Sequence, residues 1–280
     1  MLLTNLRLDR LHAAQVDFID RGMLPSTRDR VGAKANNNED EDIGDQRTVG
    51  TVSLSKTTQY TCDLFALATK VGQPRLPALV HHFLSQELSR HRALALPPQP
   101  DSRVVMSPIH IHSKITVHSS AVATFYAPSD LCGDHGMRRE FIRAVESWQN
   151  EGSRYDCVFV NSESGLPGMR GLDVVRALLF FSFKHQGRFY PCALVHWYSK
   201  LGVGPDEDTR MWAVQPAVDE AGENIISVIH LDTLVRAAHL IGIYGPHFVP
   251  RHLTSSKSLD FFSAFYVNKF ADHHSFELAF

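Results

Sequence analysis

The sequence predicts an α+β fold, in which an N-terminal helical hairpin precedes a mainly antiparallel β-meander or small barrel with peripheral helices. Three observations support this prediction. Between residues 57 and 91, apolar residues recur at helical spacing. After residue 104, apolar and polar residues alternate with a period of two, as in half-buried strands. Turn-forming segments with glycine, at residues 185–188 and 219–224, separate apolar runs that would pair as hairpins.

The composition is that of a globular protein that can bury a core. The chain has 280 residues, of which 44% are hydrophobic and 21% charged. Its net charge of −2 gives no electrostatic reason to expect binding to nucleic acid or to an acidic membrane. The sequence contains no run of 18 apolar residues, so no transmembrane helix is predicted. Four widely spaced cysteines without a C-x-x-C pair indicate free, buried thiols in a reducing compartment: Cys62, Cys132, Cys157 and Cys192.

The first region, residues 1–56, predicts a short helix and a linker. Leucines and other apolar residues in residues 1–22 partly fit an amphipathic helix, and the start of the chain does not read as a secretory signal. Residues 25–50 contain few apolar side chains and the polar run NNNEDED at 36–42. Such a segment cannot bury enough apolar surface to offset the entropy of ordering, so we expect a disordered linker.

The second region, residues 57–96, predicts a helical hairpin. Gly72 and Pro74 end a first helix, whose apolar face is Leu64, Leu67, Ala68 and Val71. Pro77 is favoured in the first turn of a second helix. The apolar stripe of this second helix is Leu79, Val80, Phe83, Leu84 and Leu88. The proline-rich segment at 97–100 then marks a stiff boundary.

The third region, residues 101–280, predicts the β domain. Strands are expected at residues 104–106, 109–118, 121–126, 155–160 and 239–243. Two hairpins are expected, one from residues 174–183 and 190–198 and one from residues 211–218 and 225–231. Short helices are expected at residues 137–148, at residues 233–237 after Asp232 as a cap, and at residues 258–265 after Ser258 as a cap.

Histidines and cysteines form one candidate metal site. His110 and His112 share a strand face, and Cys132 and His135 could complete a zinc site. The other interpretation is a polar face of an edge strand beside an ordinary loop. The absence of a second ligand pair with finger-like spacing favours that interpretation, so no metal ligand is predicted.

No segment predicts a catalytic site. The acidic loop at 206–208 lacks the ligand spacing of a calcium-binding loop. Ser162 and Ser164 lack the Gly-x-Ser-x-Gly pattern of a nucleophile elbow. A proton relay or metal site at residues 272–274 is less frequent than a partly packed chain end. The chain is therefore expected to be no enzyme and to need no cofactor.

An interaction surface is the remaining prediction. Aromatic residues are dense in the β region, and a subset facing outward would form a peptide- or methyl-lysine-binding patch. Arg138, Arg139 and Arg143 would form a basic face on the helix expected there, although Glu140 and Glu146 interleave with them and favour an ordinary amphipathic surface. The predicted surface consists of Trp197, Tyr198, Trp212, Arg138 and Arg139.

Ten segments, together with GQPRLP at 72–77, carry a resemblance to a known family. They are FYAPSDL (125–131), GMRR (136–139), YDCVFV (155–160), GLDV (171–174), LFFSF (179–183), YPCALV (190–195), PDEDTRMW (205–212), VIHLD (228–232), RAAHLI (236–241) and FYVNKF (265–270). In this order they resemble the C-terminal region of transposase-like proteins of mushroom-forming fungi, the Plavaka group related to Kyakuja-Dileera-Zisupton elements. The resemblance covers about residues 105–280.

The resemblance implies an accessory role. In such elements, DNA cleavage needs an acidic triad and two metals on a ribonuclease-H-like core, which would lie upstream of these segments. No catalytic residue can therefore be carried over. The β-meander also resembles chromatin-reader barrels of the bromo-adjacent-homology type, at the level of fold alone.

We therefore expect a non-catalytic C-terminal fragment of a mobile-element protein that acts inside the cell as a protein- or chromatin-interaction module, in the nucleus if it binds chromatin. It would have no membrane contact. The alternatives are a nucleic-acid-binding accessory domain, which the net charge does not support, and a metal-dependent protein that uses the His and Cys residues above.

Overall fold

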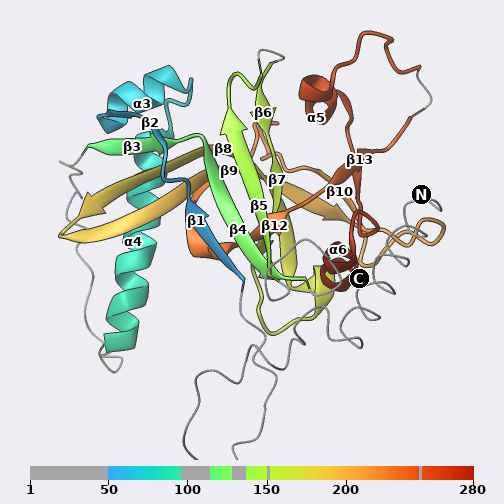
Figure 1. The fold of residues 1–280 in the computed structure, drawn as a ribbon, viewed down its shortest axis with the longest axis horizontal. Helices are drawn as coiled ribbons and strands as arrows, with labels where there is room; N and C mark the ends of the chain where they lie inside the picture. The colour runs from blue at the N-terminus through green and yellow to red at the C-terminus, as the bar shows by residue number, and fades with distance from the viewer. Residues whose placement is uncertain (1–49, 96–113, 128–136, 150–151, 246–247) are drawn as a thin grey trace, which may run out of the picture. The chain divides into compact units, whose positions relative to one another are not determined.

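The computed structural model describes residues 50–95, 114–127, 137–149, 152–245 and 248–280. In this part of the chain, most strands are antiparallel, helices are few, and the larger sheet curls into a half-barrel (Figure 1). The expectation of a mixed fold with mainly antiparallel strands is thus confirmed. The short helix predicted at residues 1–22 and all but the last residue of the linker predicted at residues 25–50 lie outside the described residues, as do the candidate ligands His110, His112, Cys132 and His135.

The bounds of the elements are as follows. The strands are β1 (Thr51–Leu54), β2 (Thr58–Cys62), β3 (Ile115–His118), β4 (Ser120–Tyr126), β5 (Met137–Val145), β6 (Arg154–Tyr155), β7 (Cys157–Asn161), β8 (Leu172–His185), β9 (Arg188–Leu201), β10 (Ala213–Pro216), β11 (Ile226–His230), β12 (Leu234–Ala237), β13 (Leu240–Gly242) and β14 (Phe265–Val267). The helices are α3 (Leu64–Lys70), α4 (Leu76–Ala95), η2 (Gly168–Arg170), η3 (Leu231–Thr233), η4 (Ser255–Lys257), α5 (Ser258–Phe261) and α6 (His273–Leu278).

Strands β8 and β9 form a long hairpin on which the rest of the larger sheet is built. Gln186 and Gly187 connect the strands with φ angles of 51° and 78°. Two successive positive φ angles give a tight turn whose twist matches that of the strands, and glycine adopts them without steric cost. The hairpin predicted around residues 185–188 is confirmed.

Shorter strands extend this hairpin on both edges. Strand β8 pairs with β7 near its start and with β3 near its end, and β9 pairs with β11 and then with β10. A register shift between Ala177 and Leu179 inserts one residue into β8. This bulge keeps Val175, Ala177 and Phe180 on the same face, although their numbers change parity. The bulge therefore gives each face one continuous row of apolar side chains.

The smaller sheet, in the order β1-β4-β5-β6, covers one face of the hairpin (Figure 1). Phe125 and Ile142 from this sheet are buried against Phe180 and Val195 from the hairpin. Full burial of such side chains contributes roughly 1.5–3 kcal/mol each relative to exposure. The outer face of β5 is consequently directed away from this core.

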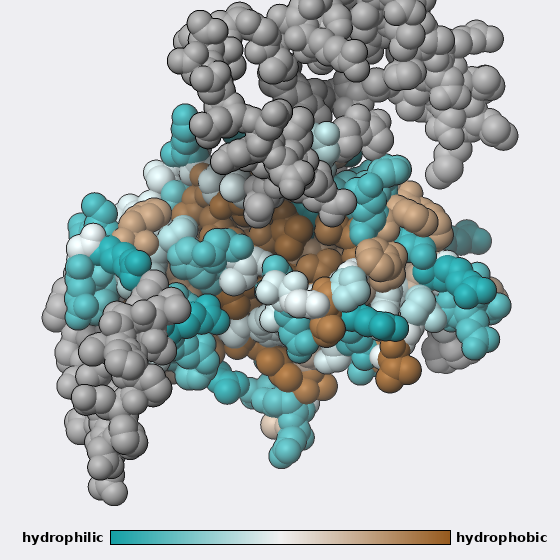
Figure 2. Space-filling view, turned by 90° about the horizontal axis from the view of Figure 1, so that it is seen from below, coloured by the Kyte–Doolittle hydropathy of each residue, from teal (hydrophilic) through white to brown (hydrophobic). Residues whose placement is uncertain are grey.

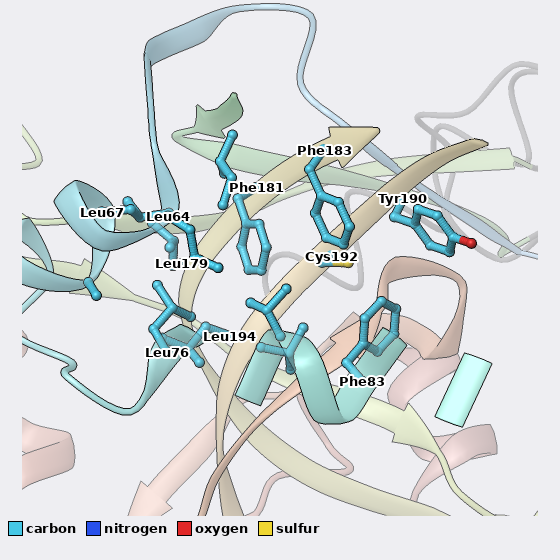
Figure 3. Close-up of a cluster of buried hydrophobic side chains, with 14 of the residues drawn as sticks. Leu64, Leu67, Leu76, Phe83, Leu179, Phe181, Phe183, Tyr190, Cys192 and Leu194 are labelled. Carbon is cyan, nitrogen blue, oxygen red and sulfur yellow. The ribbon is translucent and has the colours of Figure 1, made fainter. Parts of the chain in front are cut away.

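The opposite face of the hairpin carries two cores. Near the turn, Phe83 of α4 and Leu67 of α3 pack on Phe181, Phe183 and Tyr190 (Figure 3). Helix α3 begins at Asp63, whose carboxylate accepts a hydrogen bond from the Ala66 N–H at 2.8 Å. Further along the hairpin, a third cluster contains Phe159, Met169, Val174, Tyr198, Trp212 and Phe265.

The prediction of a helix at residues 137–148 was wrong, because β5 occupies residues 137–145. Ile142 and Ala144 are buried while Phe141 is exposed, which is the alternation of a strand. The spacing of Phe141, Ile142, Val145 and Trp148 also fits one helical face, so the pattern alone was ambiguous. Pairing with β4 over seven positions satisfies the backbone and decides in favour of the strand.

Three other predictions need correction. Residues 234–237 form strand β12 against β7, and the short turn before it is capped by His230 rather than by Asp232. Strands β10 and β11 both pair with β9 and do not pair with each other, so they form no regular hairpin; between them, the chain closes a short turn through the bridge between Val218 and Asn224. Helix α5 spans only four residues, since Phe265 begins strand β14.

Helix α6 was not predicted, and Asp272 caps it by accepting a hydrogen bond from the Ser275 N–H at 2.7 Å. Among the helices that the structure describes, none has both the length and the apolar character needed to cross a membrane. In the space-filling view, hydrophobic residues gather near the middle of one face and hydrophilic residues lie around them (Figure 2).

Candidate functional site

Arginine and aromatic side chains alternate along the outer face of β5 and past its end. Strand geometry places Arg139, Phe141 and Arg143 on one face. Trp148, after the strand, and Arg154, at the start of β6, continue the row. We call these five residues the arginine–aromatic ladder.

The ladder is held together by cation–π contacts. The guanidinium carbons of Arg139 and Arg143 each lie 5.5 Å from the centre of the Phe141 ring. Arg143 also lies 4.0 Å from the Trp148 ring, and Arg154 lies 5.6 Å from it. Each ring is thus contacted by two guanidinium groups. Contacts of this kind contribute about 0.5–1 kcal/mol each at exposed sites.

The ladder presents positive charge to solvent. Phe141 is 46% exposed and Arg139 is exposed. Partial burial lowers the pKa of Arg143, and the neighbouring charge of Arg154 lowers it further. Arg154 pairs with Asp156 at 2.8 Å, whereas Arg139 and Arg143 form no ion pair with any described residue. Two guanidinium groups are therefore available to an anionic ligand.

The acidic residues in this segment do not neutralise those two charges by direct pairing. Glu140 lies on the opposite face of β5, where it accepts hydrogen bonds from Arg236 at 2.8 Å and from the Ala237 N–H at 2.7 Å. Glu146 lies past the end of β5 and is exposed. The interleaving that indicates an amphipathic helix in the sequence instead separates Glu140 from the arginines, because a strand has a period of two.

A cavity of about 400 Å³ adjoins the ladder. It is lined by Trp148 and Arg154 and by Ser255, Ser256 and Leu259 from the segment between β13 and β14. Arg176 of β8 also lines the cavity although it is only 9% exposed. Its guanidinium carbon lies 5.5 Å from the centre of the Tyr155 ring. The cavity therefore brings a buried cation and two aromatic rings together.

Arg176 is paired with one carboxylate, that of Asp260 on α5. The two nitrogens at the end of its guanidinium donate to the two carboxylate oxygens, one of them at 3.3 Å. Burial alone would lower the pKa of Arg176, but the hydrogen bond and charge of Asp260 raise it above its ordinary value. The Asp260 side chain is 62% exposed, and the Arg176 Nε is buried without a hydrogen-bond partner.

Cys157 lines the same cavity but is not suited to nucleophilic chemistry. Burial is the main reason that the pKa of its thiol is raised to about 12. The thiolate is the reactive form of cysteine, so this thiol is inert near neutral pH. What the cavity offers is hydrogen bonding, stacking and two guanidinium groups, that of Arg154, which pairs with Asp156, and that of Arg176.

The structure does not bring the sequence-predicted surface residues together. Tyr198 and Trp212 are buried core residues, and the Trp212 Nε1 donates to the Phe280 carbonyl at 3.4 Å. Trp197 is half-buried, and its Nε1 donates to the Ser227 hydroxyl at 2.6 Å. These three residues therefore form no exposed patch.

The two predicted arginines separate as well. Arg138 lies on the inner face of β5, 3.5 Å from the Asp272 carboxylate, while Arg139 belongs to the ladder. Sequence reasoning did not select Phe141, Trp148 or Arg154 as site residues. The signal that could have found them is the sequence R-E-F-I-R at 139–143, in which cation, ring and cation recur with strand spacing.

The other candidates from the sequence have structural partners. The Asp206 carboxylate accepts hydrogen bonds from the backbone and hydroxyl of Thr209, which closes a turn. The Ser162 hydroxyl donates to Asp173 at 2.7 Å. His274 stacks on Phe125 with ring centres 4.5 Å apart. Within the described ranges, no group of three or more His, Cys, Asp or Glu residues could hold a metal ion.

Comparison of the chain with protein-family models, with curated proteins and with solved structures gives no match. The function therefore has to be inferred from the ladder, the cavity and the sequence resemblance.

Proposed function

We propose that this chain is a non-catalytic interaction module of a transposase-like protein and that the arginine–aromatic ladder binds single-stranded nucleic acid. The observation that carries the proposal is the alternation of guanidinium groups and aromatic rings along the outer face of β5 and past its end. The interpretation of α3 and α4 as the helical hairpin that precedes the β domain in that family belongs to the same proposal.

The chemistry of the ladder matches that of an unpaired strand. Guanidinium groups bind phosphate oxygens in a planar, bidentate geometry. Aromatic rings stack on bases that are not already stacked in a duplex. Alternate side chains of a strand lie about 7 Å apart, so cations and rings address successive parts of an extended ligand. Sequence preference is expected to be weak, because every base has a face that can stack.

Charge complementarity distinguishes this ligand from the tails of histones. Those tails are rich in lysine and arginine. Arg139 and Arg143, which form no ion pair with a described residue, would repel them. The aromatic patch that would favour a methyl-lysine ligand is not formed, since Tyr198 and Trp212 are buried. The chain's net charge of −2 does not oppose the proposal, because binding depends on the local field at the ladder.

Fluorescence anisotropy with a labelled oligothymidylate of about 12 nucleotides tests the proposal. We expect Phe141→Ala and Trp148→Ala each to weaken binding, by about 5- to 150-fold, because each removes one base-stacking ring. Arg143→Gln is expected to reduce the slope of log affinity against log salt by about 0.7, the value for one phosphate contact of a single strand.

Matched controls come from the tip of the β8–β9 hairpin. Phe189 is 54% exposed and Arg188 is exposed, and neither belongs to the ladder. Phe189→Ala and Arg188→Gln should therefore leave the affinity unchanged. Equal losses in control and ladder variants would show that the ladder is not the binding face. If polyglutamate competes as well as unlabelled oligothymidylate, the ladder binds acidic protein segments and the nucleic-acid proposal is wrong.

A further inference from the structure

The cavity beside the ladder is continuous with it. Trp148 and Arg154 belong to both, so a strand that lies along the ladder reaches the cavity. The cavity is also lined by Ser255, Ser256 and Leu259, which belong to the segment between β13 and β14. An extended ligand could therefore place one end group inside the cavity.

We propose that the cavity binds the terminal, phosphate-bearing nucleotide of a strand, with Arg176 as the phosphate ligand. This inference rests on the proposed function of the ladder. In the free protein the guanidinium of Arg176 donates hydrogen bonds to the Asp260 carboxylate. In the complex the terminal phosphate takes the place of that carboxylate.

The contrast in burial between the two partners makes this exchange favourable. The Asp260 side chain is 62% exposed, so its carboxylate is already largely hydrated and can turn fully into water. Arg176 is 9% exposed, and a buried guanidinium without an anion is strongly unfavourable. Loss of the carboxylate therefore requires another anion in its place. A terminal phosphate carries more negative charge than a carboxylate and matches the planar fork of arginine.

The dimensions and lining of the cavity suit one nucleotide. Its volume of about 400 Å³ lies within the range of about 300–1,000 Å³ of small-molecule sites. The rings of Trp148 and Tyr155 line it and can stack on a base. The Ser256 hydroxyl shares a hydrogen bond with Thr254 at 3.0 Å, and Ser255 lines the wall beside it. Hydroxyl groups at this position can donate to phosphate or sugar oxygens.

Competition between Asp260 and the ligand has an unusual consequence. Asp260→Asn removes the internal anion but keeps the size of the side chain, so it should strengthen binding of a phosphate terminus. Arg176→Lys keeps the charge but loses the fork, so it should weaken that binding. A purely structural role of the Arg176–Asp260 pair predicts no gain in affinity from Asp260→Asn.

The test is isothermal titration of the purified chain with matched oligothymidylates. One carries hydroxyl groups at both ends, one carries a 5′-phosphate and one a 3′-phosphate, and thymidine monophosphate is the fourth probe. We expect a phosphate at one end to strengthen binding about tenfold or more, as a hydrogen-bonded charged group does. Asp260→Asn should increase this preference and Ser255→Ala should reduce it, and circular dichroism checks that Arg176→Lys folds.

The outcomes separate the two proposals. If ladder variants weaken all strands but a terminal phosphate at either end has no effect, the cavity proposal is overturned and the ladder proposal stands. If thymidine monophosphate binds in an Arg176-dependent way but no strand binds, the cavity is a nucleotide site and the ladder proposal is wrong. A loss of phosphate preference in Asp260→Asn would contradict displacement. Failure of all four probes to bind overturns both proposals.

Discussion

Arg176 and Arg236 are two buried arginines in similar surroundings with different partners. Both have a buried Nε without a hydrogen-bond partner, and both lie over an aromatic ring, Tyr155 at 5.5 Å and Phe125 at 4.4 Å. They differ in the exposure of the carboxylates that neutralise them. This difference separates an arginine that holds the fold together from one that can exchange its anion.

Arg236 is enclosed by two carboxylates. Glu140 accepts a hydrogen bond from it at 2.8 Å, and the two oxygens of Asp272 accept at 2.8 and 2.7 Å. Both carboxylates are largely buried, and His274 lies 3.2 Å from the same guanidinium. The cluster ties β12 to β5 and to the start of α6. No partner here can turn into water as Asp260 can.

The largest loss of stability is expected for Arg236→Gln. Removal of this guanidinium takes away the cation shared by Glu140 and Asp272 in a mostly buried site and leaves Asp272 with the more distant Arg138, at 3.5 Å. Breaking a buried ion pair in this way costs about 3–5 kcal/mol. Urea denaturation monitored by circular dichroism measures the change in the free energy of unfolding. Arg176→Gln is the matched control and should cost less, because the carboxylate that it leaves unpaired is exposed. Equal losses would contradict the comparison.

Acidification should loosen the Arg236 cluster in two stages. Burial and the nearby Arg236 lower the pKa of His274, so its neutral form stabilises the fold and stability decreases as the pH falls below about 6.5. Burial alone would raise the pKa of Asp272, but hydrogen bonds from Arg236 and Ser275 outweigh it and hold the pKa well below its usual range. Stability should therefore fall again below about pH 4, where the unfolded carboxylate begins to protonate.

Urea denaturation as a function of pH checks both stages. His274→Gln should flatten the upper stage, and Asp272→Asn should flatten the lower one while lowering stability at neutral pH. An unchanged pH profile in both variants would show that these groups are not linked to folding.

Whether a feature of the fold could be predicted from the sequence depends on how far apart along the chain its interacting residues lie. The β8–β9 hairpin was predictable, since Gln186 and Gly187 form a local turn between apolar runs. The Arg236 cluster was not, because it joins Glu140, Arg236 and Asp272, which are 96 and 36 residues apart. Pairing of this kind leaves no periodic signal in the sequence.

The ladder was missed for a different reason. Residues 137–148 fit a helix and a strand about equally well, and the assignment decides which side chains are neighbours. As a helix, Arg138 and Arg139 would share a face with the acidic residues. As strand β5, Arg139 and Phe141 face outward together while Glu140 faces the core. Only the pairing with β4, which is a tertiary contact, resolves the choice.

The smallest effect on stability is expected for Asp260→Asn. Asp260 is mostly exposed, but its replacement leaves the buried guanidinium of Arg176 without a carboxylate, so water replaces only part of the lost interaction. Exposed pairs typically contribute about 0–1 kcal/mol and breaking a buried pair costs about 3–5 kcal/mol, so for this half-buried pair we expect a loss between the two ranges. Thermal denaturation beside Arg236→Gln gives the comparison directly. A loss as large as that of Arg236→Gln would show that Asp260 is a structural anchor and would remove the basis for anion exchange.

The measurement that tests the central claim most directly is quenching of tryptophan fluorescence by oligothymidylate. The chain has three tryptophans, of which Trp212 is buried and Trp197 is half-buried and hydrogen-bonded to Ser227, whereas Trp148 belongs to the ladder. If bases stack on the ladder, quenching in the wild-type chain should reach its maximum at the same ligand concentration as binding does. The Trp148→Phe variant should still bind the oligothymidylate but should lose most of the quenching. Unchanged quenching in Trp148→Phe, or none in the wild type at saturating ligand, would contradict the proposal that the ladder binds single-stranded nucleic acid.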